Sequence, residues 1–317
     1  MWAEILTIGW ITTFLSAAVR MGIPLACASL GETVSQRAGT LNIGLEANML
    51  SGAFFGFVVT YRTGSLPLGF LAGMLGGALF SMIHAFFAVY LRQNQNVAGT
   101  ALNMFALGFT SYLFQVLVNN ADGEYPQIVT LQSLPIPGLS KIPVIGEAFF
   151  NKDVVAYTVY ILVILLAVFF KKTMWGMSLT SIGENPQAAD TVGLPVFRIK
   201  YAAALFNGLM GGLGGAYLIL AQLGMFSENV TSGRGYIALS LVVFGRRNPV
   251  GVFFASLFMG GANALQFKLQ AMGVALPVQV FTGLPYVLTV LVLLFSAVKK
   301  NNSDPAALGK PYVRSMR

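Results

Sequence analysis

Apolar runs of about 20 residues recur along the chain and alternate with short polar passages. At roughly 1.5 Å per residue, a helix of that length crosses a hydrocarbon core of about 30 Å. Because backbone groups cannot stay unpaired in lipid, each run is expected to be a helix. The pattern predicts nine spans, near residues 5–31, 43–60, 67–91, 97–119, 153–172, 200–222, 233–245, 249–268 and 278–298.

The first predicted span is long and contains Gly22-Ile23-Pro24, so a kink or a break is expected there. The span near 233–245 is short for a full crossing. No basic leader precedes the first apolar run, and no Ala-x-Ala site follows it. We therefore expect a retained span rather than a signal peptide.

Composition indicates an integral membrane protein. Of the 317 residues, 56% are hydrophobic and only 9% are charged, and the mean hydropathy is +0.73, values far from those of soluble domains. Cys27 is the only cysteine and His84 the only histidine. Cys, His and carboxylate residues are not clustered at metal-ligand spacing, so no bound metal or cofactor is expected and metal catalysis is disfavoured.

Basic residues distinguish the two sets of loops that alternating spans place on opposite sides. One set holds Arg37, Arg92, Lys171, Lys172, Arg198, Lys200, Arg246, Arg247, Lys299, Lys300, Lys310, Arg314 and Arg317. The other holds Arg62, Lys141, Lys152, Arg234 and Lys268, beside the acids Asp122, Glu124, Glu147 and Asp153. The positive-inside rule then predicts a cytoplasmic C-terminal tail and an external N-terminus. The net charge of +8 is attributed to these loops rather than to nucleic-acid binding.

The segment 120–151 is rich in Pro and Gly and faces outward in this arrangement. Two interpretations stay open for it. It either rests over the mouth of a pathway or simply connects two spans.

The two halves of the chain echo each other. Pro67-Leu68-Gly69 leads to Gly76-Gly77-Ala78, as Pro249-Val250-Gly251 leads to Gly260-Gly261-Ala262. Spans one to four then correspond to spans six to nine, and the single connecting span makes the halves opposite in topology, a common plan of transporters. We predict one all-α transmembrane domain over 1–317, with repeats at 5–119 and 200–298, a connector at 120–199 and a tail at 299–317. The alternative is chance similarity among Gly-rich helices, in which small residues favour close packing.

A polar passage within the connector stands out from this apolar background. It comprises Gly183, Glu184, Asn185, Pro186, Gln187, Ala188, Ala189 and Asp190. Asn185-Pro186 is typical of a helix start and Gly193-Leu194-Pro195 of a stop. A short helix lying along the membrane can fit a groove on a soluble partner and transmit its motion; the alternative is an ordinary polar loop.

Three stretches together resemble a known family. They are Gly31-Glu32-Thr33 with Arg37 to Glu46 and Met49 to Ala53, the passage Gly183 to Ala189 with Gly193 and Arg198-Ile199-Lys200, and Gly233 to Ser240 with Phe244-Gly245 and Asn248 to Gly251. The chain resembles the permease subunit of bacterial ABC importers of the branched-chain amino acid, ribose and nucleoside group. It is most similar to the smaller permease of nucleoside importers that use a basic-membrane-protein type lipoprotein receptor.

This resemblance, which extends roughly from residue 20 to 298, implies several partners. They are a cytoplasmic ABC ATPase that uses ATP and Mg²⁺, a second permease in a heteromeric pair, and an external substrate-binding lipoprotein, all at the bacterial cell membrane. It also implies that the Gly183–Asp190 passage is the coupling helix that meets the ATPase.

Polar residues within apolar spans are candidates for the substrate pathway. Glu46 is costly there unless it is paired or hydrated, and Asn42 is expected on the same helix face, with Asn48 pointing elsewhere. Amide and carboxyl groups suit the hydroxyls and base edges of a nucleoside. Asn103, Asn207 and Phe226 complete the predicted pathway set. The alternative for each is packing or helix bridging, with Glu46 pairing with Arg20 or Arg37.

Three classes of function remain for comparison. The leading hypothesis is a non-catalytic translocation subunit for nucleosides, with ribose, other sugars or branched-chain amino acids as alternative substrates. Because no Gly-x-x-x-x-Gly-Lys-Ser/Thr loop is present, ATP hydrolysis falls to a partner. An ion-driven secondary transporter is disfavoured by the scarcity of intramembrane ionisable residues beyond Glu46, Arg20 and His84. An intramembrane enzyme is disfavoured because no acid–base or metal constellation is found.

Overall fold

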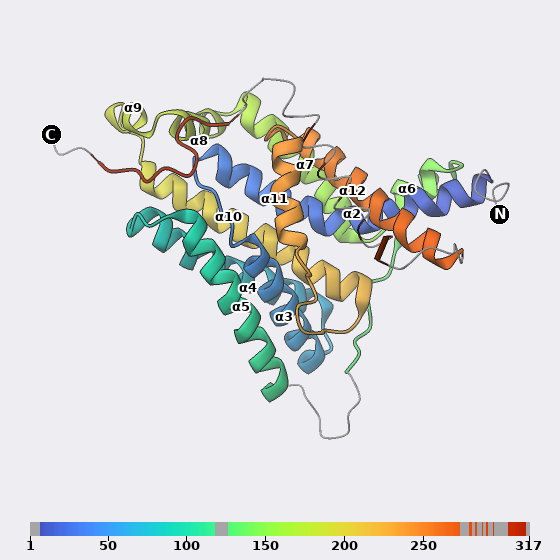
Figure 1. Ribbon diagram of the computed structural model, residues 1–317. Coiled ribbons are helices and arrows are strands. Elements are labelled where there is room, and N and C mark those ends of the chain that lie inside the picture. Colours follow the sequence, from blue (N-terminus) through green and yellow to red (C-terminus); the bar gives the residue numbers. More distant parts are fainter. Residues whose placement is uncertain are drawn as a thin grey trace.

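The computed structural model describes residues 7–117, 126–272 and 304–314, with single positions between 279 and 294. The fold is built from helices (Figure 1). In chain order they are α2 (Ile8–Arg37), α3 (Leu45–Thr63), α4 (Leu66–Ala85), α5 (Gln95–Leu117), α6 (Ile145–Phe150), α7 (Val154–Lys172), α8 (Met174–Glu184), α9 (Pro186–Thr191), α10 (Val196–Tyr217), α11 (Arg234–Phe244) and α12 (Pro249–Ala271). Two π-helical turns, η1 (Phe86–Tyr90) and η3 (Leu218–Leu223), extend α4 and α10, and a 3-10 turn, η2 (Leu139–Lys141), precedes α6.

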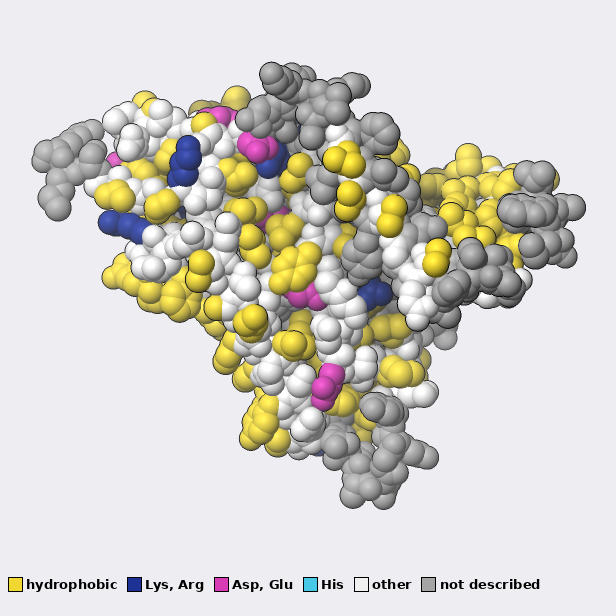
Figure 2. Space-filling view, viewed as in Figure 1, with side chains coloured by type: hydrophobic (Ala, Val, Ile, Leu, Met, Phe, Trp, Pro, Cys, Tyr) yellow, Lys and Arg dark blue, Asp and Glu magenta, His cyan; other side chains and the backbone are white. Residues whose placement is uncertain are grey.

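Within the part of the chain that the structure describes, six helices are long and apolar enough to cross a membrane. They are α2, α4 with η1, α5, α7, α10 with η3, and α12. Hydrophobic side chains cover much of the visible face in Figure 2, where charged side chains are few. The molecule is therefore a multi-pass membrane protein.

The remaining predicted spans agree with the structure to different extents. Helix α3 forms as expected but is less apolar than the six, and other helices bury most of it; a helix enclosed by protein need not match the polarity of lipid. Helix α11 is short, as predicted. Helix α2 is one unbroken helix with Pro24 inside it, so the break considered there does not occur. The predicted span 278–298 falls largely outside the described residues, and nine crossings remain a prediction.

Helix α10 forms the centre of the bundle and packs against α2, α3 and α4. It is the most enclosed of the six candidate spans, with 83% of its most apolar window buried. Its glycines allow this contact: a Cβ added to Gly77 of α4 would lie 2.5 Å from Cα of Gly212, and one on Gly211 would lie 3.0 Å from Cβ of Asn48. Without Cβ atoms the backbones approach closely, as small residues permit in membrane bundles.

Helix α12 packs on α2 in a comparable way. A Cβ at Gly260 would lie 2.5 Å from the backbone nitrogen of Gly22. The third helix of each predicted repeat thus packs against the first helix of the other.

The segment between α5 and α7 packs on η3. The Leu131 amide donates to the Leu220 carbonyl at 2.7 Å, and the short strands β1 (Leu134–Pro135) and β2 (Asn151–Lys152) pair in antiparallel fashion. This part of the connector is therefore anchored at the end of α10.

We expect Gly212→Ala to destabilise the protein by about 1–3 kcal/mol, because its new methyl group meets the Gly73 carbonyl and the α4 backbone. Gly108→Ala is the matched control, since a Cβ there meets nothing within 4 Å and alanine favours helix. Thermal unfolding of both purified variants in detergent measures the difference. Equal stability of the two would refute the close α4–α10 contact.

Candidate functional site

The polar passage forms two helices joined at Asn185. Helix α8 ends at Glu184, and the Asn185 side-chain oxygen accepts from the Ala188 amide at 3.0 Å, which caps α9. Pro186 occupies the first turn of α9, and Gly193 follows its end with φ of +87°. The predicted start and stop of a helix are both confirmed.

One side of this pair of helices is exposed and the other is packed. Glu184, Gln187 and Ala188 are exposed, whereas Gly183 and Ala189 are buried. Gly183 lies directly on the carbonyl of Arg37 at the end of α2, where a Cβ has no room. The passage thus presents a polar surface while its back is fixed to the end of α2.

A C-terminal segment, residues 304–314, runs alongside this passage (Figure 1). The Ala307 amide donates to the Gly183 carbonyl at 3.0 Å, and the Ala306 amide donates to Glu184 Oε2 at 3.3 Å. Arg314 forms an ion pair with Asp190 at 3.1 Å. We call residues 304–314 the strap, because they tie α8 and α9 to the bundle.

Arg247 connects the strap to the interior. It lies between α11 and α12 with its side chain only 4% exposed, and its Nη1 contacts Asp304 Oδ1 at 2.6 Å. Its Nε donates to Gln36 Oε1 at 3.0 Å, and its carbonyl accepts from Arg37 Nε at 2.8 Å. A buried guanidinium must be paired and hydrogen-bonded to be tolerated, so Asp304 of the strap helps to hold this turn in place.

Glu32 continues the same chain of contacts inward. The residue is fully buried in α2. Its Oε1 accepts from Gln36 Nε2 at 3.0 Å and from the Asn42 amide at 3.2 Å, and its Oε2 accepts from Asn207 Nδ2 at 2.7 Å. Contacts therefore run without a gap from Asn207 in α10 through Glu32, Gln36 and Arg247 to Asp304 in the strap.

Glu32 is not among the site residues predicted from the sequence, although it belongs to the Gly31-Glu32-Thr33 stretch. An acid flanked by apolar turns with Gln36 four residues later is the local signal that was available. Its partners Asn207 and Arg247 are far away in sequence, and only the fold brings them together.

Glu46 caps a helix in this structure. Its Oε1 accepts from Thr231 Oγ1 at 2.5 Å and the Gly233 amide at 2.8 Å, and its Oε2 accepts from the Gly235 amide at 2.6 Å. These amides form the N-terminus of α11, where a carboxylate is favoured. The salt bridges formed among the described residues do not include Arg20 or Arg37 with Glu46. The expected shared helix face with Asn42 is wrong, because Asn42 precedes α3.

The other predicted pathway residues are also buried. Asn103 accepts from the Ala47 amide and donates to Tyr236 Oη, so it bridges three helices. Phe226 is 1% exposed and packs among other aromatic rings. Both side-chain polar atoms of Asn42 and Asn48, and Oδ1 of Asn207, find no hydrogen-bond partner among the described residues. Such unpaired amides are rare in buried regions.

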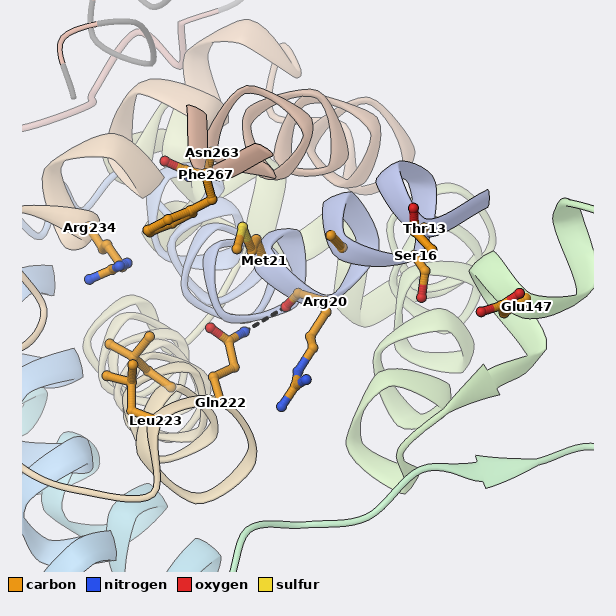
Figure 3. Close-up of a pocket in the computed structure, with 12 residues that line it drawn as sticks. Thr13, Ser16, Arg20, Met21, Glu147, Gln222, Leu223, Arg234, Asn263 and Phe267 are labelled. Atoms are coloured by element: carbon orange, nitrogen blue, oxygen red, sulfur yellow. Dashed lines mark hydrogen bonds between the residues drawn. The ribbon is translucent and has the colours of Figure 1, made fainter. Parts of the chain in front are cut away.

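A cavity of about 420 Å³ opens at the other end of the bundle (Figure 3). Helix α2, α6, η3, α11 and α12 contribute its walls. Its lining consists of Thr13, Ser16, Ala17, Arg20, Met21, Glu147, Leu218, Gln222, Leu223, Arg234, Asn263 and Phe267. None of the six predicted pathway residues, Asn42, Glu46, Asn48, Asn103, Asn207 and Phe226, lines this cavity.

Positive charge predominates around this cavity. Arg20 and Arg234 line it, and both are oriented by backbone carbonyls, Arg20 by Ala221 at 2.5 Å and Arg234 by Val230 at 3.0 Å. Lys152 Nζ donates to Ser16 Oγ at 2.6 Å. Burial lowers the pKa of Lys152 to about 8, and the neighbouring Asp153 opposes that shift. Glu147 is the one acidic residue in the lining, so the cavity offers cationic, amide and aromatic groups together.

These features define a multi-pass membrane protein with an exposed helical element at one end and a polar cavity at the other, as a permease requires. The chain belongs to the family described as "Branched-chain amino acid transport system / permease component", whose profile matches residues 14–296. It is a member of the ABC transporter permeases, which are non-catalytic subunits.

Several curated relatives cover almost the whole chain. The guanosine ABC transporter permease NupQ of Bacillus subtilis is 36% identical, over 97% of this chain and 98% of its own length. The nucleoside ABC transporter permease NupC of Lactococcus lactis is 38% identical, over 92% and 94%. A putative glucose ABC transporter permease of Haloferax volcanii is 34% identical, over 95% and 98%.

One solved structure has a related fold. It is PsaBC from Streptococcus pneumoniae in complex with Fab, with a TM-score of 0.54 and 15% identity, and the match covers 96% of this chain and 98% of that chain. At this identity the likeness concerns the fold alone.

Glu32→Leu is expected to destabilise the bundle, because it leaves the donors of Gln36, Asn42 and Asn207 without their acceptor, at about 1–3 kcal/mol for each unpaired group. Glu228→Leu, at an exposed carboxylate, is the control and should change little. Thermal unfolding of the purified variants checks this.

The double variant Glu32→Leu/Asn207→Leu removes both members of one pair and should cost less than the sum of the single variants. Strictly additive losses would show that the two side chains do not interact.

Proposed function

We propose that this chain is the translocation subunit of an ATP-driven importer for nucleosides, which moves substrate from an external binding protein to the cytoplasm by alternating access. The observation that carries the proposal is the exposed α8–α9 element, tied by the strap to a polar network that reaches the centre of the bundle. Membership of the ABC permease family supplies the expected power source.

The strap end is proposed to be cytoplasmic. Arg37, Arg247 and Arg314 lie at the same end as Lys171 and Lys172, consistent with the positive-inside rule. The cavity around Arg20 would then open externally. In this orientation the α8–α9 surface faces the compartment that holds ATP.

Coupling is proposed to occur through Gly183–Asp190. ATP-dependent closure of the partner ATPase, with its Mg²⁺, would push on the exposed face of α9. Because Gly183 contacts α2 and Glu184 contacts the strap, the push reaches the Arg247–Gln36–Glu32 chain as a rigid-body displacement. A flexible loop at this position would absorb the same displacement.

The proposed architecture retains two inverted repeats. Helix α4 packs on α10, and α12 packs on α2. In two structurally equivalent halves, the third helix of each half would pack on the first helix of the other in this way. The relatives named NupB and NupC in Lactococcus lactis, which are both nucleoside ABC transporter permeases, support a pair of different permeases.

We propose that the pathway joins the external cavity to the buried junction of α2, α3 and α10. Gln222, Asn263 and Phe267 offer amide hydrogen bonds and a stacking surface suited to a nucleoside. The unpaired amides of Asn42, Asn48 and Asn207 would meet substrate or water once this junction opens. For Glu46, Asn103 and Phe226 the contacts favour the packing role that the sequence left open.

Ala188→Trp is expected to abolish both ATPase co-purification and uptake, because a bulky side chain on exposed α9 prevents close docking. Ala188→Ser is the matched control, since it keeps the capped backbone amide and adds little volume. Glu184→Lys should weaken docking in the same direction. Full retention of ATPase binding and uptake by Ala188→Trp would exclude the coupling role.

Uptake of labelled guanosine or adenosine should fall in the presence of excess unlabelled nucleoside and persist in the presence of glucose, ribose or leucine. Competition by glucose would instead favour a sugar as the substrate. Glucose is included because one relative is named as a putative glucose permease. Uptake that continues without the ATPase and collapses with the proton gradient would favour an ion-driven transporter.

A further inference from the structure

A second cavity lies in the lateral surface of the bundle, between α7, α8 and α10. It is a groove of about 610 Å³. Its lining is Val34, Leu166, Phe169, Trp175, Leu179, Pro195, Arg198, Ile199, Ala202, Ala203 and Phe206. Arg198 is the only charged residue in this set, so the groove is an apolar channel with one cationic position.

The surfaces that flank the groove are apolar and exposed. Helix α7 is the least enclosed candidate span, with 28% of its most apolar window buried, and α8 projects Met174 and Trp175, which are 78% and 71% exposed. In a membrane protein such surfaces contact acyl chains. The groove is therefore continuous with a surface that faces lipid.

Basic residues and a tryptophan place one end of the groove at the membrane surface by the distribution that such residues have in membrane proteins. Helix α7 ends there with Lys171 and Lys172, both exposed, and α10 begins there near the exposed Arg198. Trp175 has the amphipathic ring typical of the interface between lipid and water. Basic residues between membrane helices at this depth attract anionic headgroups.

Nearby acidic groups do not compensate this charge within the groove. The lining contains no Asp or Glu. Glu184 and Asp190, on α8 and α9, are engaged by the strap through Ala306 and Arg314. Arg198 therefore faces the apolar groove without an acidic residue in the lining to neutralise its charge.

The lining favours a lipid as the occupant. It is apolar except for Arg198. An acyl chain requires an apolar channel, and an anionic headgroup requires a cation at the end of that channel.

We propose that this groove is a binding site for a glycerophospholipid with an anionic headgroup, with an acyl chain between Leu166 and Phe206 and the phosphate at Arg198. The bound lipid would contact α7, α8 and α10 at once. This inference does not depend on the transported substrate or on the direction of transport.

Native mass spectrometry of the purified permease with its partner subunits, incubated with phosphatidylglycerol or phosphatidylcholine, tests the site. The wild type should retain phosphatidylglycerol preferentially. Arg198→Gln should weaken that retention about tenfold, the loss expected for one charge-assisted hydrogen bond. Arg92→Gln, at an exposed basic residue outside the groove lining, is the control and should retain the lipid as the wild type does.

Ala202→Phe provides a second measurement, because it fills the groove and should reduce retention of both lipids; Ala101→Phe, at an exposed position on α5, is its control. A photo-crosslinker at position 202 should label lipid. Equal retention by the wild type and Arg198→Gln, or crosslinking of position 202 to the second permease, would overturn the proposal. Nucleoside uptake is a separate readout, so failure of the transport proposal would leave these results unaffected.

Discussion

Backbone contact between α10 and the helices around it is the interaction on which the rest of the structure depends. Gly211 and Gly212 let α3 and α4 approach α10 without intervening side chains. Lipid supplies no hydrophobic force that would drive helices together, so close packing and hydrogen bonds must do so. Gly31 and Gly214 allow an equally close approach between α2 and α10, which brings Asn207 Nδ2 within 2.7 Å of Glu32 Oε2. The polar network exists because the glycines remove the side chains that would separate these helices.

Glu32 and Glu46 are both buried, and each carboxyl group is surrounded by hydrogen-bond donors. Glu46 receives three donors at the start of α11, and Glu32 receives three at the α2–α10 contact. Burial of a polar group is costly without such partners. A conformational change that separated either carboxyl group from its donors would have to provide new hydrogen-bond donors. The two carboxylates therefore mark where the bundle is held in a defined arrangement.

The helices could be predicted from residues that are neighbours in the sequence, whereas contacts between residues far apart in the sequence could not. The cap at Asn185, the proline that follows it and the apolar runs depend on neighbouring residues, and the helices of this kind within the described residues formed where expected. The pathway residues depend on which helices meet. An acid within an apolar run, such as Glu46, looks the same in sequence whether it faces a channel or caps α11, and the strap carries no periodic pattern. Arg247 and Asp304 are 57 residues apart, so their ion pair has no local signature.

The strap also imposes an order on the making of the molecule. Residues 304–314 leave the ribosome after every helix that they contact. Helices α8 and α9 are synthesised much earlier, yet the surface that they share with Ala306, Ala307 and Arg314 forms only after the strap has been made. A partner that recognised this combined surface would therefore discriminate against chains that end before the strap.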